Sequence, residues 1–325
     1  MKTKKALLSI VVVACLFYGC RPSKQSNNES INNDMKNQTS TLRLIYPQWQ
    51  GGVVEHWMPD IPADDASRGY YLGSHLLQYL APDSGQKTVE VPVSLDVNNR
   101  GVKHGINAYD AIVRQTRAAL DILNKENPER IVTLGGDCAV SVVPFTYLFS
   151  KYPGDVAIVW IDAHPDVTLP GDEYEGYHAM ALTACLGMGN KDIMDMLPDK
   201  ADASKAIIVG LRSWDEGMRE RQEELGIKGL APEETATDSR AVVDWLKSTG
   251  ATKVVIHFDL DVLDPAEIIA GVGIEPNGMK IAEAVRIIND VASEYDLVGL
   301  TVAEPMFRTM LKMKNMLNEL PLLKD

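Results

Sequence analysis

The chain of 325 residues contains little cysteine and has no excess of basic residues. Two of its four cysteines, Cys15 and Cys20, lie near the N-terminus, which leaves Cys138 and Cys185 for the rest of the chain. Two isolated cysteines do not make a disulfide framework, so the class of small disulfide-stapled proteins is excluded. The net charge of −13, without a long basic stripe, argues against a nucleic-acid-binding surface.

One apolar run near the N-terminus covers residues 6–18, follows three lysines and ends at Gly19-Cys20. It is too short to span a membrane comfortably, and its basic flank is typical of a secretory signal peptide. Gly before Cys resembles the lipobox of bacterial lipoproteins. We therefore expect a signal peptide at residues 1–20 with lipidation at Cys20; an uncleaved anchor helix is the alternative.

Residues 21–41 are rich in Asn, Ser, Lys and Gln and have almost nothing to bury, which predicts a flexible tether. Residues 42–325 are expected to form one domain, because no internal repeat and no Pro- and Gly-rich loop marks a second one. The predicted location is the bacterial cell envelope, with membrane contact only through the lipid anchor. A periplasmic or secreted protein is the alternative.

Apolar, strand-like runs alternate with amphipathic stretches through this domain. Such alternation predicts a three-layer α/β/α fold with a mostly parallel central sheet. The expected strands are 42–46, 89–93, 131–134, 157–161, 206–209, 254–258 and 298–302, and helical patterns cover 108–124, 178–186, 240–247 and 281–294.

Metal-binding side chains alternate along the sequence after two of these strands. Asp162, His164 and Asp166 follow one strand, and Asp259 and Asp261 follow another. Side chains at i, i+2 and i+4 of an extended segment point the same way, so the two strand ends can bring four carboxylates and an imidazole together. Divalent cations usually neutralise such a charge density. The alternative is a set of separate strand-end or helix-capping acids.

Several motifs resemble those of the ureohydrolases, the family of arginases, agmatinases and formimidoylglutamases. Residues 162–166 match Asp-Ala-His-x-Asp, and residues 257–265 match Ser-x-Asp-x-Asp-x-x-Asp-Pro with His257 at the serine position. Residues 135–139 match Gly-Gly-Asp-His-Ser with two changes. Weaker matches are Gly-Leu-Arg-x-x-Asp at 210–215 and the strand that ends at Glu304. The resemblance covers roughly residues 42–310 and implies the arginase-like form of the α/β fold.

The resemblance implies a centre of two divalent ions, manganese in this family, that activates water. The implied ligands are Asp162 and Asp259 as bridges, Cys138 and Asp166 for one ion, and His164 and Asp261 for the other. Cys138 replaces a histidine, and a thiolate shifts metal preference toward Zn²⁺, Fe²⁺ or Co²⁺. A branch of the family that acts on hydroxyarginine also carries cysteine here. The alternative for Cys138 is a small buried filler with the metal lost.

The resemblance also implies the catalytic and substrate-binding residues. His178 would shuttle a proton, and Glu304 would hold the guanidinium group by paired hydrogen bonds. Asp215 would meet an α-amino group, and Thr168 stands where arginases carry an asparagine that grips the amino-acid end of the substrate. Because Thr168 and residues 174–179 depart from the arginase pattern, the substrate is left open.

The expected function is hydrolysis of the guanidino or amidino group of a small linear substrate, with release of urea or a related amide. Arginine, hydroxyarginine, agmatine and formimidoylglutamate are the candidate substrates. A non-catalytic, ligand-binding envelope lipoprotein and a one-zinc deacetylase of the same superfamily fold are the alternatives. By resemblance, a homo-oligomer, either a trimer or a hexamer, is expected.

We predict that the segment before Cys20 is absent from the mature protein, because its length and basic flank suit a cleaved signal. Mass spectrometry of the N-terminus in the envelope fraction checks this. An intact Met1 terminus would contradict the prediction. A soluble, unacylated product that starts elsewhere would preserve export but remove lipidation at Cys20.

Overall fold

The computed structural model describes residues 40–323, and its centre is an eight-stranded sheet in which all neighbouring strands are parallel. In spatial order the strands are β2 (Lys87–Glu90), β1 (Thr41–Tyr46), β5 (Arg130–Gly135), β10 (Asp296–Ala303), β9 (Lys253–Asp259), β6 (Val156–Ile161), β7 (Ala206–Val209) and β8 (Lys228–Leu230). A separate antiparallel pair joins β3 (Val102–Lys103) to β4 (Ile106–Asn107).

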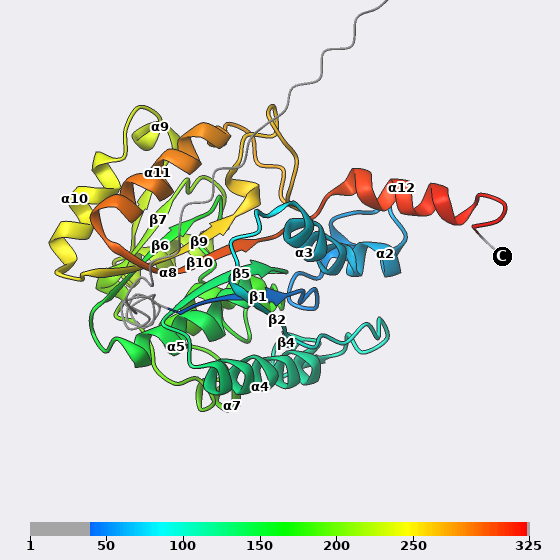
Figure 1. The fold of residues 1–325 in the computed structure, drawn as a ribbon, viewed down its shortest axis with the longest axis horizontal. Helices are drawn as coiled ribbons and strands as arrows, with labels where there is room; N and C mark the ends of the chain where they lie inside the picture. Colours follow the sequence, from blue (N-terminus) through cyan, green and yellow to red (C-terminus); the bar gives the residue numbers. More distant parts are fainter. Residues whose placement is uncertain (1–39, 324–325) are drawn as a thin grey trace, which may run out of the picture. The chain divides into compact units, whose positions relative to one another are not determined.

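Helices cover both faces of the sheet, which confirms the predicted three layers (Figure 1). One face packs against α4 (Tyr109–Glu126), α5 (Val142–Lys151) and α6 (Ala181–Cys185), and the other against α10 (Arg240–Thr249) and α11 (Ile281–Glu294). The remaining helices are α2 (Ala63–Ser67), α3 (Gly69–Leu80), α7 (Lys191–Met194), α8 (Glu216–Glu224), α9 (Pro232–Thr235) and α12 (Arg308–Asn318). All six residues of β6 are buried, as expected for a central parallel strand.

Short 3-10 turns follow several of these elements. They are η1 (Val54–His56), η2 (Cys138–Ser141), η3 (Tyr177–Met180), η4 (Ala203–Lys205) and η5 (Leu260–Val262). The predicted helix at 178–186 is therefore a 3-10 turn followed by the short helix α6.

All seven predicted strands belong to the sheet, with small changes at their ends. The strand predicted at 89–93 lies at Lys87–Glu90. Val91 still donates to the carbonyl of Ile45 at 2.8 Å, but Pro92 has no N–H with which to continue the ladder. The first strand begins at Thr41, so this residue, predicted to be the last of the tether, belongs to the sheet.

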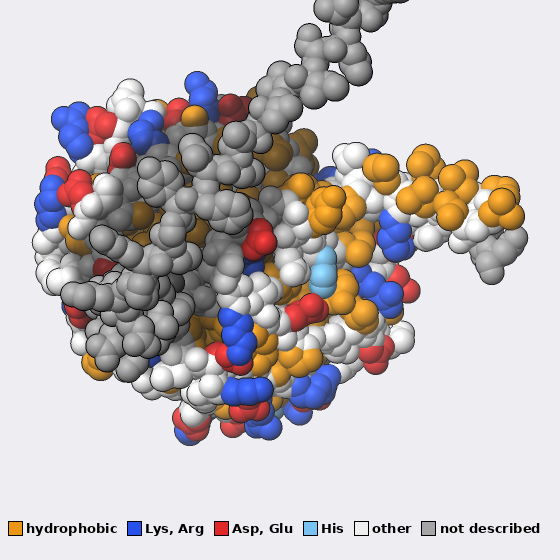
Figure 2. Space-filling view, viewed as in Figure 1, with side chains coloured by type: hydrophobic (Ala, Val, Ile, Leu, Met, Phe, Trp, Pro, Cys, Tyr) orange, Lys and Arg blue, Asp and Glu red, His pale blue; other side chains and the backbone are white. Residues whose placement is uncertain are grey.

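The predicted signal peptide, the lipidation site Cys20 and nearly all of the tether lie outside the described residues. Within residues 40–323, no helix is long and apolar enough to cross a membrane. Figure 2 shows hydrophobic side chains gathered along α12, where Met313, Met316 and Leu317 are exposed.

Candidate metal centre and active site

The predicted site residues meet at the carboxyl ends of four adjacent strands, β5, β10, β9 and β6. Asp162 follows β6, Asp259 is the last residue of β9, and Glu304 follows β10. Ala303 pairs with Asp259 in the register of β10 and β9, which sets Glu304 beside this strand end. Cys138 begins the 3-10 turn after β5. This edge is where ligands bind in open parallel sheets.

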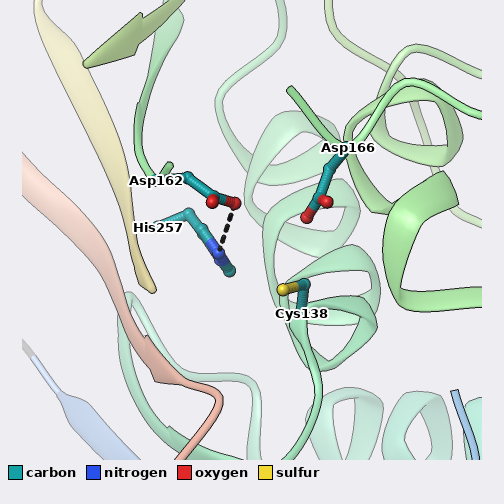
Figure 3. A group of neighbouring side chains, drawn as sticks. All are labelled: Cys138, Asp162, Asp166 and His257. Atoms are coloured by element: carbon teal, nitrogen blue, oxygen red, sulfur yellow. Dashed lines mark ion pairs between the residues drawn. The ribbon is translucent and has the colours of Figure 1, made fainter. Parts of the chain in front are cut away.

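Three groups of metal-competent atoms form among the described residues. Asp162 belongs to two of them, and the third consists of Cys138, His178 and Glu304. The first donor group consists of Cys138, Asp162, Asp166 and His257 (Figure 3), and the second consists of Asp162, His164 and Asp261. Within each group the candidate ligand atoms all lie within 4.8 Å of one another. A carboxylate shared by two groups is placed as a bridging ligand has to be.

Asp259 lies close to the first donor group, although it is in none of the donor groups formed by residues 40–323. Its Oδ2 lies 3.0 Å from Cys138 Sγ, and its Oδ1 accepts the N–H of Asp261 at 2.7 Å. The second predicted bridging ligand is thus in contact with the cluster through Cys138.

The donor chemistry fits divalent cations. Asp166 Oδ2 and Asp261 Oδ1 are buried without a hydrogen-bond partner among residues 40–323, and such groups normally bind an ion or ordered water. Burial, reinforced by neighbouring carboxylates, raises the pKa values of Asp162, Asp166 and Asp259. Burial and the charges of Asp166 and Asp259 also raise the pKa of the Cys138 thiol. A bound cation would favour the ionised forms of all these groups.

The second donor group contains an ion pair. Asp261 Oδ2 lies 3.2 Å from His164 Nδ1. Burial acts to lower the pKa of His164, but the charge of Asp261 and hydrogen bonds to Asp162 and Asp261 outweigh it and raise that pKa well above its usual range. Burial likewise opposes ionisation of Asp261, yet the neighbouring His164 lowers its pKa. The protonated imidazole therefore neutralises part of the carboxylate charge.

His178 and Glu304 lie together beside Cys138. His178 Nδ1 is 3.4 Å from Glu304 Oε1, and the same oxygen accepts the N–H of Cys138 at 3.0 Å. Burial lowers the pKa of His178 to about 4, so the imidazole is neutral at pH 7. Burial raises the pKa of Glu304 to about 8, against the hydrogen bond from Cys138. A neutral imidazole keeps a lone pair on one ring nitrogen, which can accept a hydrogen bond.

Two ligand-site acids adopt backbone conformations that are rare for their residue types. Asp166 has φ 50° and Glu304 has φ 63°, both in the left-handed region. The backbone of Glu304 is held by its own N–H, which donates to the Gly136 carbonyl at 2.8 Å. On the other side, a Cβ at Gly73 of α3 would lie 1.6 Å from the Pro305 carbonyl oxygen. Only glycine at 73 allows α3 to pack this closely behind Glu304.

A cavity of about 630 Å³ opens onto these side chains. Apolar and aromatic side chains and three charged ones form the rest of its wall: Trp57, Tyr174, Met218 and Ile274, with Asp215, Glu275 and Arg308. A cavity of this size and mixed lining suits a small ligand.

The two predicted substrate-binding residues differ in position. Asp215 lines the cavity, and its carboxylate also caps α8 by accepting the Met218 N–H at 2.7 Å. Its contact with a substrate amino group stays a prediction. Thr168 is buried, is not among the residues that line the cavity, and is left out of the proposed site.

The family model of the arginase family matches residues 75–306, a span that contains all the donor residues and Glu304. The chain belongs to the arginase family.

Relatives within this family include enzymes with different names. An arginase from Staphylococcus aureus is 26% identical over 203 residues, covering 54% of this chain and 65% of the relative. An N(omega)-hydroxy-L-arginine amidinohydrolase from Streptomyces lavendulae is 29% identical over 199 residues, covering 61% and 67%. The alignments to two Staphylococcus aureus arginases cover 65% and 62% of their lengths, less than two thirds.

The fold is also shared with solved structures. An arginase from Entamoeba histolytica, determined in complex with L-ornithine, matches with a TM-score of 0.65 at 18% identity, covering 82% of this chain and 90% of the other. This likeness confirms the arginase-like α/β fold.

Three side chains of this arginase-family site were not predicted to act in it. The Tyr70 hydroxyl donates to Glu304 Oε2, and Tyr174 lies 2.7 Å from His178 Nε2. His257 joins the first donor group, although its match to the family's serine position does not make it a ligand. Tyr174 lies in the stretch that departs from the arginase pattern, and this departure could have marked it as a site residue. Nothing in the sequence around Tyr70 marks that residue.

The stability of the metal-free protein is predicted to be lower at pH 8 than at pH 5, with most of the fall above about pH 6.5. Burial raises the folded-state pKa of Glu304 from 4.5 to about 8 and that of Asp137 from 3.8 to about 7. Burial lowers the pKa values of His178 and His257 to about 4 and about 3, which opposes the effect of the acids only up to about pH 6.5. Above that pH these four groups together hold more protons in the folded state than in the unfolded state, so raising the pH favours unfolding. We expect the thermal midpoint to be lower at pH 8 than at pH 5 by on the order of 5–10 °C.

Thermal unfolding of the chelated protein at the two pH values measures this difference. Excess Zn²⁺ or Mn²⁺ should reverse the trend, because ligand deprotonation then favours the folded, metal-bound state. A midpoint of the chelated protein that rises from pH 5 to pH 8 would contradict the prediction.

Proposed function

We propose that the protein is a metal-dependent amidinohydrolase that cleaves a C–N bond in the guanidino or amidino group of a small linear substrate. The products would be urea, or a related amide, and an amine. The observation that carries this proposal is the pair of donor groups that share Asp162. Members of both groups line one cavity together with His178 and Glu304: Cys138 and Asp166 of the first group, and His164 and Asp261 of the second.

Glu304 is suited to orient the substrate. Its Oε1 accepts the Cys138 N–H and its Oε2 accepts the Tyr70 hydroxyl, so the carboxylate is held in one orientation. Burial raises the pKa of Glu304, and a cationic guanidinium beside it would lower that pKa and stabilise the ionised carboxylate. Two parallel N–H···O bonds from a planar guanidinium to a carboxylate add both energy and direction.

Divalent cations held by the two donor groups would supply Lewis acidity and make hydroxide available near neutral pH. His178 would take up the proton released by the attacking water and pass it to the leaving amine. Its imidazole is neutral, and its Nε2 faces the Tyr174 hydroxyl, which fixes the ring, while Nδ1 faces Glu304. Tyr174 is itself tied to the Gly52 carbonyl at 3.2 Å, which anchors this arrangement to the cavity wall.

The alternatives differ in metal content. A one-zinc deacetylase would need only one of the two donor groups, and a non-catalytic ligand-binding protein would have no use for a shared carboxylate. The substrate is proposed to be a guanidino or amidino compound from the set of arginine, hydroxyarginine, agmatine and formimidoylglutamate. The similarity to a hydroxyarginine amidinohydrolase supports including hydroxyarginine in the panel. Manganese is proposed as the metal, with Zn²⁺, Fe²⁺ or Co²⁺ favoured to the extent that Cys138 is a ligand.

We also propose an envelope-anchored homo-oligomer, a trimer or hexamer. The exposed apolar side chains of α12 support self-association. Light scattering of the purified protein checks this, and we expect a mass of three or six chains. A monomer at micromolar concentration would contradict it.

Asp162→Asn should abolish both metal retention and hydrolysis, because Asp162 belongs to both donor groups. His178→Ala should keep the metals and lower turnover by roughly 10²–10⁴-fold, the range for loss of a proton-transfer residue. Metal analysis and urea release across the guanidino panel measure the two effects separately.

Asp264→Asn is the matched control for the first variant. Asp264 lies in the same strand-end motif but outside the donor groups, and the amide oxygen can still accept the Ala266 N–H. This variant should keep the metals and most of the activity. Loss of the metals in His178→Ala would remove the assignment of His178 as a proton carrier. Full activity of Asp162→Asn would overturn the proposed function.

A further inference from the structure

His257 is placed as a ligand would be. It lies in β9, opposite Trp160 of β6 and Thr301 of β10, and its side chain is fully buried. Its ring stacks on the Trp160 indole with centroids 3.7 Å apart and planes 10° apart. Along β9, residues i and i+2 share a face, so His257 points to the same side of the sheet as Asp259.

One ring nitrogen of His257 is partnered and the other is not. Nδ1 lies 2.8 Å from Ser141 Oγ, whereas Nε2 is buried and has no hydrogen-bond partner among the described residues. When Nδ1 donates its proton to Ser141, Nε2 keeps a free lone pair. Hydrogen bonding at one nitrogen commonly fixes the tautomer and orientation of a metal-binding histidine in this way.

The free nitrogen faces the first donor group. Nε2 lies 3.8 Å from Asp162 Oδ2, which is too long for a hydrogen bond. A nitrogen and an oxygen donor held about 2.0–2.2 Å from one tetrahedral ion lie about 3.3–3.6 Å apart, so a shift of a few tenths of an ångström would let both bind a shared ion. Figure 3 shows His257 beside Asp162, with the Cys138 and Asp166 side chains across from them.

We propose that His257 is itself a metal ligand, which with Cys138, Asp162 and Asp166 forms a mixed nitrogen, sulfur and oxygen site that prefers Zn²⁺ to Mn²⁺. Thiolate and imidazole are the donors that favour zinc, whereas manganese favours oxygen donors. The second donor group, with two carboxylates and one imidazole, lacks the sulfur. The inference rests on the metal centre of the proposed function and assigns the donors and preference of one of its two positions.

Co²⁺ and Zn²⁺ binding to the metal-free full chain test this assignment. In the wild-type protein, bound Co²⁺ should give intense visible bands typical of four-coordinate cobalt. It should also give a thiolate charge-transfer band, and Cys138→Ser should remove that band. His257→Phe keeps the stacking shape but removes the nitrogens, and His257→Asn keeps a polar group without an imidazole.

Both His257 variants should lose the intense visible bands and bind Zn²⁺ at this position more than about 100-fold more weakly. They should also lose most of the preference for Zn²⁺ over Mn²⁺. Partners that only orient a ligand typically cost 10–100-fold in affinity, so the size of the loss separates the two roles. His75→Phe is the matched control, because His75 also contacts an aromatic ring, that of Tyr71, but lies outside the donor groups.

A loss of less than about 100-fold, or an unchanged cobalt spectrum in a folded His257 variant, overturns the inference. If neither variant folds, X-ray absorption of a His164→Asn protein loaded with zinc decides it, because this variant lacks the imidazole of the second donor group and a zinc shell with sulfur but without imidazole overturns the inference. Hydrolysis is not the readout. If the wild-type protein cleaves no guanidino compound but the His257 variants lose zinc, the proposed function is refuted and the assignment of His257 as a ligand stands.

Discussion

The structure depends on the concentration of acidic groups at one edge of its central sheet. Four adjacent parallel strands end within reach of one another, and Asp162, Asp166, Asp259 and Asp261 are buried there. Buried like charges are costly unless they are paired or bind a cation. Within the chain, His164 neutralises part of this charge through its ion pair with Asp261. The pKa values of the other three acids are raised, because their negative charge is not neutralised in this way.

Paired strands and close packing hold the side chains proposed to be catalytic around this charge. Glu304 follows a strand that is paired on both sides, and its left-handed backbone turns its carboxylate toward Cys138 and His178. The close approach of Gly73 leaves no room for that turn to relax toward α3. Strain of this kind persists only where the surroundings determine the conformation, and it is common at functional sites. The most buried part of the sheet therefore also positions the chemistry.

The features that could be predicted from sequence are those with a local pattern. Alternating acids after two apolar runs were sufficient to predict the cluster of metal-competent side chains, because the carboxyl ends of parallel strands meet at one edge. The helix α5 was not predicted, since eight of its ten residues are buried and it has no polar face to give a helical period. The partnership of Tyr70 with Glu304 joins residues 234 positions apart, and no local pattern reports such a contact.

His257 shows why residue-by-residue comparison with a family pattern has a limit. His257 occupies a position where the family pattern has serine, so the comparison places it beside the ligands and not among them. At position 138, a cysteine replaces the histidine of the pattern. Considered separately, the change at 257 adds an imidazole that the family pattern does not use as a ligand. The change at 138 removes an imidazole that the pattern does use. In the structure both side chains face Asp162 and Asp166, so the imidazole is supplied from β9 instead of from the turn after β5. A metal centre constrains the donors around an ion and not the strand from which each donor comes. Two substitutions that each weaken the pattern can therefore together preserve a nitrogen donor and, through the added sulfur, change which ion it suits.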